Sequence, residues 1–178
     1  MEESPAFLND SAVILAAKGN HEEAIACLRR GIQLAPRNAI LWFNLGLSLR
    51  ATGKLTEARE ALLKAAEANP TDVDSIDTLA VVLHETGEDA AGERMYRNAL
   101  ELAPGNGRVW NNYGVLLFGQ ARYPEACQAF EKAVALVPDF ADALYNLRDT
   151  YEELGRHDDA RKCGAMFTRL ESRHAKKD

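Results

Sequence analysis

Small, large and helix-breaking residues recur along the chain at one fixed interval. Pro36, Pro70, Pro104 and Pro138 lie 34 residues apart, without an insertion. Between successive prolines, apolar residues return every three or four positions in two segments, which is the spacing of amphipathic helices. A fixed period of this length is typical of repeat proteins. The pattern therefore predicts an all-α fold built from five consecutive helix hairpins.

The period also gives bounds for each part of the chain. We expect a disordered N-terminus over residues 1–4, a repeat array over 5–174 and a polar tail over 175–178. The five hairpins are predicted at residues 5–38, 39–72, 73–106, 107–140 and 141–174. The last hairpin departs from the pattern at Arg148, Gly164 and Ser172. Because terminal repeats meet solvent on one side, we interpret it as a capping unit whose second helix runs on toward the C-terminus.

Local signals mark the helix ends inside this frame. Each of the four periodic prolines should end a second helix, because proline disfavours the helical conformation of the residue before it. Asn38, Asp72 and Asn106 then stand where a side chain can accept from the first free amides of the next helix. Gly46 and Gly114 remove bulk where the two helices of a hairpin approach each other. The second and fourth hairpins are therefore the most regular ones.

The residues of these two hairpins carry a family resemblance. Two matching series resemble the tetratricopeptide repeat: Trp42, Leu45, Gly46, Leu49, Ala58, Leu62, Ala65 and Pro70, and Trp110, Tyr113, Gly114, Leu117, Ala126, Phe130, Ala133 and Pro138. The resemblance implies that the hairpins stack into a right-handed α-solenoid. It also implies that the first helices line a concave groove and that the second helices form a convex back.

Composition and charge exclude several classes of function. The net charge of -6 argues against a surface that neutralises phosphates, so we expect no nucleic-acid partner. No run approaches the roughly 18 apolar residues of a spanning helix, and no secretory signal is visible, so we expect no membrane insertion. The three cysteines are odd in number and widely spaced, which favours reduced thiols in a cytoplasmic protein.

Polar and aromatic residues remain on the first helices once the packing positions are assigned. Asn44, Asn112 and Asn146 occupy equivalent places in three hairpins. An Asn side chain offers a donor and an acceptor, so such a ladder can hold the main chain of an extended peptide, as similar asparagines do in tetratricopeptide proteins. A solvated face without a ligand is the alternative. The predicted peptide-binding site comprises Asn44, Asp77, His84, Arg108, Asn111, Asn112, Phe118, Tyr145, Asn146 and Asp149.

The charges on these helices bear on the kind of peptide. Chaperone-binding tetratricopeptide domains hold a C-terminal carboxylate with Lys and Arg, but the corresponding places here carry Asn9, Val13, Asp74 and Thr78. Without those cations, carboxylate capture is disfavoured. Acidic residues outnumber basic ones along the predicted groove, which leads to the hypothesis of a basic partner. A solvated acidic face is the alternative to this hypothesis.

Signals for catalysis and metal binding are missing from the sequence. The four histidines are scattered over the first, third and fifth hairpins, and no H-E-x-x-H or C-x-x-C motif occurs. We therefore expect no enzyme activity, no metal and no cofactor. The leading hypothesis is a non-enzymatic scaffold that binds an extended peptide or a helix of a partner protein. The alternatives are a self-assembling or complex-assembly protein that uses its ends and convex face, including a homo-oligomer, and the targeting portion of a larger enzyme.

Overall fold

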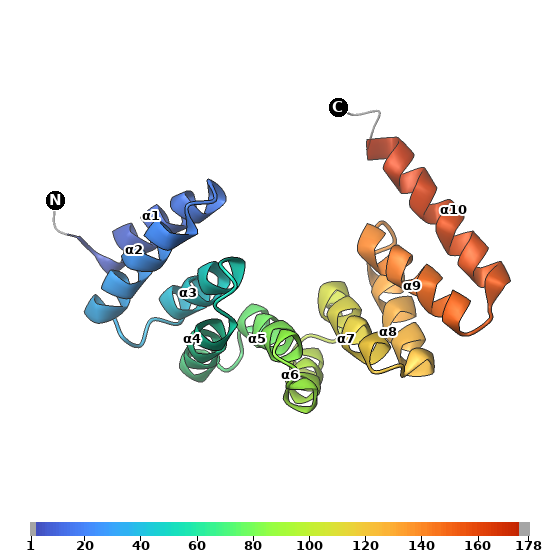
Figure 1. Ribbon diagram of the computed structural model, residues 1–178, viewed down its shortest axis with the longest axis horizontal. Helices are drawn as coiled ribbons and strands as arrows, with labels where there is room; N and C mark the ends of the chain where they lie inside the picture. The colour runs from blue at the N-terminus through green and yellow to red at the C-terminus, as the bar shows by residue number, and fades with distance from the viewer. Residues whose placement is uncertain (1–2, 175–178) are drawn as a thin grey trace. The chain divides into compact units, whose positions relative to one another are not determined.

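The computed structural model describes residues 3–174 (Figure 1). Within that range the chain forms ten helices and no strand, so the predicted all-α repeat fold is confirmed. The helices are α1 (Pro5–Ala17), α2 (His21–Leu34), α3 (Ala39–Ala51), α4 (Leu55–Ala68), α5 (Val73–Glu85), α6 (Asp89–Leu102), α7 (Gly107–Gly119), α8 (Tyr123–Leu136), α9 (Ala141–Glu153) and α10 (His157–His174). The predicted tail, 175–178, and residues 1–2 lie outside the described part.

The chain divides into two compact units, Met1–Asn98 and Ala99–Asp178, with the division inside α6. In the N-terminal unit α1 pairs with α2 and α3 pairs with α4. The second helix of each pair also packs on the first helix of the next, α2 on α3 and α4 on α5. Leucines and alanines of these helices form one core, in which Leu28, Leu41 and Leu62 are fully buried. Stacking thus buries both faces of a hairpin that has too little surface to bury them alone.

The C-terminal unit repeats this arrangement. Helix α7 pairs with α8, α9 pairs with α10, and α8 packs on α9. The core of this unit contains Leu117, Phe130, Leu144 and Tyr151, and it includes the two buried thiols of Cys127 and Cys163. The last helix is longer than the other second helices and continues to His174, as the sequence predicts.

The three predicted N-caps are confirmed. Asn38 accepts from the amides of Ile40 and Leu41, Asn106 accepts from those of Arg108 and Val109, and Asp72 accepts from Ser75. The sequence analysis missed a fourth cap, because Ser4, in the segment predicted to be disordered, accepts from the amide of Phe7. In the fifth hairpin Phe140 stands at the cap position and makes no side-chain hydrogen bond there.

Helix-to-helix packing depends on one small residue in each regular hairpin. A Cβ added at Gly46 would lie 2.6 Å from Leu62 Cγ, and one added at Gly114 would lie 2.6 Å from Phe130 Cε1. Small residues on the first helices therefore admit large residues from the second. The fifth hairpin reverses these sizes: Arg148 stands on the first helix and Gly164 on the second, with a Cβ at Gly164 lying 3.7 Å from Arg148 Cδ.

Candidate functional site

The predicted site residues fall into two groups, one in each unit. Asn44, Asp77 and His84 belong to the N-terminal unit, and the other seven belong to the C-terminal unit. In the N-terminal unit Asn44 of α3 donates from Nδ2 to Asn9 Oδ1 of α1 at 2.7 Å. Both residues are half-buried. Successive first helices are therefore joined by an amide pair, and part of the hydrogen-bonding capacity of Asn44 is used within the protein.

Asp77 does not lie on an exposed stripe, contrary to the sequence-based expectation. The residue is only 3% exposed. Burial and then the nearby Asp77 carboxylate raise the pKa of the Tyr96 phenol. A carboxylate with so little exposed surface offers little to a peptide. We therefore correct the placement of Asp77 from the surface to the interior.

His84 of α5 faces the beginning of α6. Its Nδ1 lies 2.7 Å from Asp89 Oδ1, and about a third of its side chain is exposed. The contact ties the end of α5 to the helix that follows it.

A charge pair crosses the first helices of the N-terminal unit. Arg50 of α3 donates from Nε and Nη2 to the Glu85 carboxylate of α5, with distances of 2.5–3.1 Å. The hydrogen bond to Glu85 raises the pKa of the Arg50 guanidinium, and burial opposes this effect. The sequence analysis did not predict this pairing. The two charges cancel locally, which leaves less net charge on the first helices of this unit than the sequence suggests.

Three asparagines form a chain of hydrogen bonds in the C-terminal unit. Asn146 of α9 donates from Nδ2 to Asn111 Oδ1 at 3.0 Å, and Asn111 donates to Asn112 Oδ1 at 3.5 Å. Asn111 is 6% exposed, so the expectation that it lies on the surface is wrong. Its place in the period is that of Asn9 and Asp77, and polar side chains there serve the contact between hairpins. Asn112 and Asn146 remain half-exposed above it.

A small cavity opens beside this chain, between α7 and α9. It has a volume of about 80 Å³ and is lined by Val115, Phe118, Phe130, Asn146 and Asp149. The sequence analysis assigned Phe130 to packing alone, yet its ring also borders the cavity. The fold thus brings three predicted residues, Phe118, Asn146 and Asp149, to one hollow with an apolar lining and two polar groups. Such a combination suits a ligand side chain held by apolar contact and oriented by hydrogen bonds.

Tyr145 precedes Asn146 on α9 and is 46% exposed. The Arg148 guanidinium lies 4.3 Å from the centre of its ring, and the Phe167 ring of α10 meets it edge-on at 6.1 Å. Arg148 also donates to Asp149 Oδ1 at 2.7 Å. The sequence analysis treated Arg148 only as a departure from the repeat pattern, and its contacts show that it orients two of the predicted residues.

Arg108 takes a different place from the other predicted residues of this unit. It is exposed and lines a shallow hollow at the start of α7 with Asn106, Val137 and Phe140. The cavity between α7 and α9 has no contribution from it. The structure therefore does not bring Arg108 together with Asn146 and Asp149.

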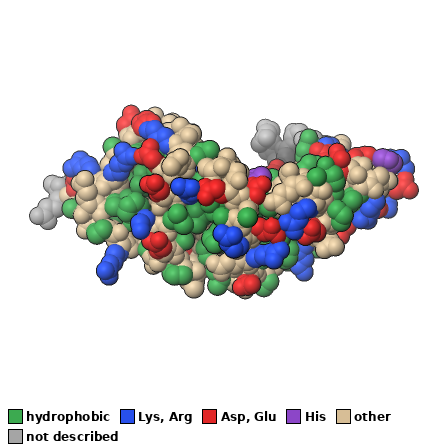
Figure 2. All heavy atoms as spheres, turned by 60° about the horizontal axis from the view of Figure 1, so that its bottom comes forward, with side chains coloured by type: hydrophobic (Ala, Val, Ile, Leu, Met, Phe, Trp, Pro, Cys, Tyr) green, Lys and Arg blue, Asp and Glu red, His purple; other side chains and the backbone are tan. Residues whose placement is uncertain are grey.

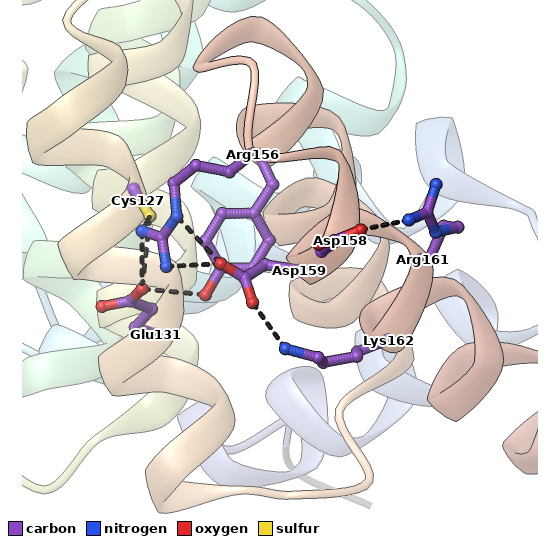
Figure 3. Close-up of polar contacts among 8 residues, drawn as sticks. Cys127, Glu131, Arg156, Asp158, Asp159, Arg161 and Lys162 are labelled. Atoms are coloured by element: carbon purple, nitrogen blue, oxygen red, sulfur yellow. Dashed lines mark hydrogen bonds and ion pairs between the residues drawn. The ribbon is translucent and has the colours of Figure 1, made fainter.

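A polar network in the C-terminal unit joins α8 to the last hairpin (Figure 3). Tyr151 donates to Glu131 Oε1 at 2.8 Å, and the Arg156 guanidinium lies 4.4 Å above the Tyr151 ring and 3.5 Å from Glu131. Arg156 also donates to Asp159 at 2.9 Å. Burial, with the adjacent Glu131, raises the pKa of the Cys127 thiol to about 12. A thiol held neutral near pH 7 is not an activated nucleophile, so this network is a structural one.

The described residues offer no other sign of chemistry. No group of three or more His, Cys, Asp and Glu among them is arranged to hold a metal ion. None of the helices in the described part combines the length and apolar character that crossing a membrane requires. Lys and Arg side chains are interspersed with Asp and Glu over the face shown in Figure 2. That face carries no extended patch of one sign.

Comparison with known families agrees with the helical repeat fold. Residues 16–168 match the family model described as the TPR domain of cytochrome c-type biogenesis protein H, where TPR denotes the tetratricopeptide repeat. Among solved structures, the chain is similar to the crystal structure of MamA, with a TM-score of 0.82 and 22% identity over 93% of this chain and 96% of MamA. It is also similar to the structure of PilF from Pseudomonas aeruginosa, with a TM-score of 0.85 and 18% identity over 93% of this chain and 76% of that one.

Curated relatives come from different kinds of protein. The type IV pilus assembly protein PilF of Pseudomonas aeruginosa is 36% identical over 115 residues, which are 64% of this chain and 43% of PilF. The BBSome complex member BBS4 of Bos taurus is 31% identical over 138 residues, 76% of this chain and 27% of BBS4. The probable N-acetylglucosaminyltransferase SPINDLY of Hordeum vulgare is 28% identical over 128 residues, 68% of this chain and 14% of SPINDLY.

The chain thus spans less than half of the length of each of these relatives. What they share with it is the repeat array. Because the family model covers most of the chain and the helix hairpins have the matching fold, the chain belongs to the tetratricopeptide-repeat family.

Proposed function

We propose that this chain is a non-enzymatic scaffold that binds a segment of a partner protein on the α7–α9 face of its C-terminal unit. The observation that carries the proposal is the cavity of about 80 Å³ beside Asn146. It joins an apolar lining to polar side chains, and three of its residues were predicted from the sequence. The relatives support the general role, since PilF and BBS4 are named for pilus assembly and for membership of a complex.

The arrangement suggests how such a segment would be held. Asn112 and Asn146 are half-exposed, and an Asn side chain carries both a donor and an acceptor. They would pair with the main chain of an extended segment. One of its apolar side chains would enter the cavity against Val115 and Phe118, and the exposed ring of Tyr145 would cover the neighbouring residue. Affinity would come mainly from the buried apolar group and direction from the amides.

The ion pairs of α9 limit where a basic residue of the partner could bind. Asp149 accepts from Arg148, and Glu152 lies 2.6 Å from His157 Nδ1. Asp142 and Glu153 remain as exposed acidic residues of α9. We therefore propose that a Lys or Arg of the partner lies near the ends of α9 rather than in the cavity.

The test of the groove is a quantitative pull-down from the source cells. We expect the double variant Asn112→Ala/Asn146→Ala to lose the captured partner, while Gln128→Ala, an exposed change on α8, leaves it bound. Removal of the Asn146 amide also removes its hydrogen bond to Asn111, so circular dichroism is needed as a control for folding. We expect the double variant to have the same helicity as the wild type. Val115→Trp provides a second route, since it fills the cavity and leaves the asparagines intact. Retained binding in both variants would move the site elsewhere.

Two alternative functions can be tested in parallel. In the first, the chain assembles with copies of itself through its ends and convex face; light scattering would support it by showing a stable oligomer. In the second, the chain is the targeting portion of a larger enzyme, for which the match to 14% of SPINDLY is the motivating observation. Mass spectrometry of the native protein in its source cell would distinguish the second, by detecting peptides of a catalytic domain in the same polypeptide.

We further propose a cytoplasmic location, on the basis of the cysteines. Cys27, Cys127 and Cys163 are free thiols, which a reducing compartment maintains. Cell fractionation that places the protein outside the cytoplasm would overturn this proposal.

A further inference from the structure

The first hairpin exposes a face that is buried in every later hairpin. Phe7 is 51% exposed, but the residues at successive intervals of 34, which are Leu41, Ser75, Val109 and Ala143, are all 0% exposed. Two turns further along the helix, Ile14 is 57% exposed, whereas its equivalents Ser48, Val82, Leu116 and Thr150 are at most 3% exposed. In α1, large apolar side chains are thus exposed at two positions that are buried in all the later hairpins.

The later hairpins show what covers this face. In α3, α5 and α9 it packs against the second helix of the preceding hairpin. The contact is close, since a Cβ added at Gly31 of α2 would lie 3.0 Å from Leu41 Cδ2, and Leu41 is the equivalent of Phe7. On the same helix α2, Leu28 is buried in the core and Ile32 is partly buried against it. The covering element is an amphipathic helix with a small residue in its last turn and aliphatic residues close to it.

The other end of the array does not present such a helix. Gly31, Ala65, Ala99 and Ala133 are equivalent small residues, and the fifth hairpin has Phe167 at that place. The Phe167 ring packs edge-on against Tyr145. A second copy stacked through α10 would therefore meet a bulky ring where the fold elsewhere uses Gly or Ala.

From these observations we propose that the Phe7–Ile14 face of α1 is a docking site for an amphipathic helix of another polypeptide, with Gly or Ala facing Phe7. The helix takes the place that α2 takes on α3, so the site continues the interface between hairpins. This inference is independent of the proposed peptide-binding surface, which lies in the other unit.

The test supplies such a helix to the full chain. A copy of residues 39–72 is fused directly before Pro5, in the 34-residue period, so that its second helix can reach α1. We expect the fusion to raise the melting temperature by several degrees and to reduce the oxidation of Phe7 in a footprinting experiment. In a fusion that carries Phe7→Glu/Ile14→Glu both effects should be lost. Val13→Glu, an equally exposed change on the groove side of α1, should retain them.

The same proteins are then titrated with the synthetic peptide 39–72 in trans. Binding that is at least about tenfold weaker in the unfused Phe7→Glu/Ile14→Glu chain supports the site. An unchanged melting temperature in the wild-type fusion, or equal peptide binding in the double variant, would overturn it. Sedimentation decides about a second copy: an oligomer of the unfused chain that the double variant dissociates would contradict a foreign helix as the occupant.

Discussion

Ala121 adopts a backbone conformation that alanine usually avoids. The turns in the other four hairpins contain Gly19, Gly53, Gly87 and Gly155 with positive φ, and the fourth hairpin places Ala121 there with φ of 57°. A Cβ in the left-handed region costs roughly 1–2 kcal/mol. The fourth hairpin therefore keeps the turn of its neighbours at a local energetic cost.

Replacing this alanine should stabilise the protein. We expect Ala121→Gly to raise the free energy of unfolding by about 1 kcal/mol, because the relief of strain exceeds the added entropy of the unfolded chain. Urea denaturation provides the measurement. The control is Ala26→Gly at an exposed position inside α2, which should lower the stability by about 1 kcal/mol. A loss of stability in Ala121→Gly would show that φ at this residue is negative in solution.

The Cys127 thiol makes the stability depend on pH in the alkaline range. In the folded chain its pKa is raised to about 12, mainly by burial and to a smaller extent by Glu131. An unfolded cysteine has a pKa of about 8.5. A raised pKa means that the stabilisation is complete below the unfolded value and is lost as the pH rises toward the folded value. We expect the free energy of unfolding to fall above pH about 8.5, by at most about 1.4 kcal/mol per pH unit for this group.

Urea titrations between pH about 8 and about 10 check this expectation. Burial also raises the pKa of the Cys163 thiol, so part of the slope should persist without Cys127. In Cys127→Ala the decline should be shallower than in the wild type. Identical slopes would mean that the Cys127 thiol is not perturbed.

At the scale of a helix pair, the exchange of large and small residues decides how two helices approach. On the first helices, Gly114 leaves room for Phe130 and Gly46 leaves room for Leu62. In the last hairpin the order is reversed, because the large residue, Arg148, stands on the first helix and Gly164 stands on the second. The sizes of the two partners are thus matched pairwise, and neither helix alone determines which residue is small.

Alanine at two of these glycines should have opposite effects. Gly114→Ala places a Cβ within 2.9 Å of three atoms of the Phe130 ring and should destabilise the chain by about 2 kcal/mol. Gly164→Ala meets only Arg148 Cδ at 3.7 Å and should gain about 0.5–1 kcal/mol of helix propensity. Thermal denaturation of both variants measures the difference. If the two shift the midpoint in the same direction, the packing does not distinguish these sites.

At the scale of the whole molecule, the charge of the chain should govern the partner it prefers. The net charge is -6, and Asp142 and Glu153 are exposed near the proposed site. We expect a lysine-rich peptide to bind more weakly by about tenfold when NaCl rises from about 50 to about 500 mM. The same peptide with Gln in place of Lys is the control, and fluorescence anisotropy is the measurement. Affinity that salt leaves unchanged would exclude a basic partner at this surface.

Much of the fold could be predicted because its signals are local. A proline every 34 residues, Asn or Asp at the cap and Gly in the turn each act within a few residues of the chain. The fifth cap failed this logic, since Phe140 stands there. The edge-on contact of Phe167 with Tyr145 and the contacts of Arg148 with Tyr145 and Asp149 are made between side chains, and the period of the sequence does not predict them.

The candidate site was predictable only in part. Periodicity placed Phe118, Asn146 and Asp149 on adjacent turns of neighbouring helices, and they line one cavity. Asp77 and Asn111 were misplaced, because the rule that polar residues are exposed ignores polar groups buried between repeats. Which carboxylates are paired, such as Glu85, follows from side-chain contacts across hairpins and has no marker in the sequence.

The polar contacts between first helices have a further consequence for how this chain can change over time. Asn9 with Asn44, Arg50 with Glu85, and Asn111 with Asn146 are each separated by 35 residues. One inserted residue inside a first helix would turn the rest of that helix by about 100°, and a side chain beyond the insertion would then face away from its partner. Mutation should therefore alter side chains far more readily than length, and recombination between hairpins should yield folded products when it occurs in whole steps of 34 residues.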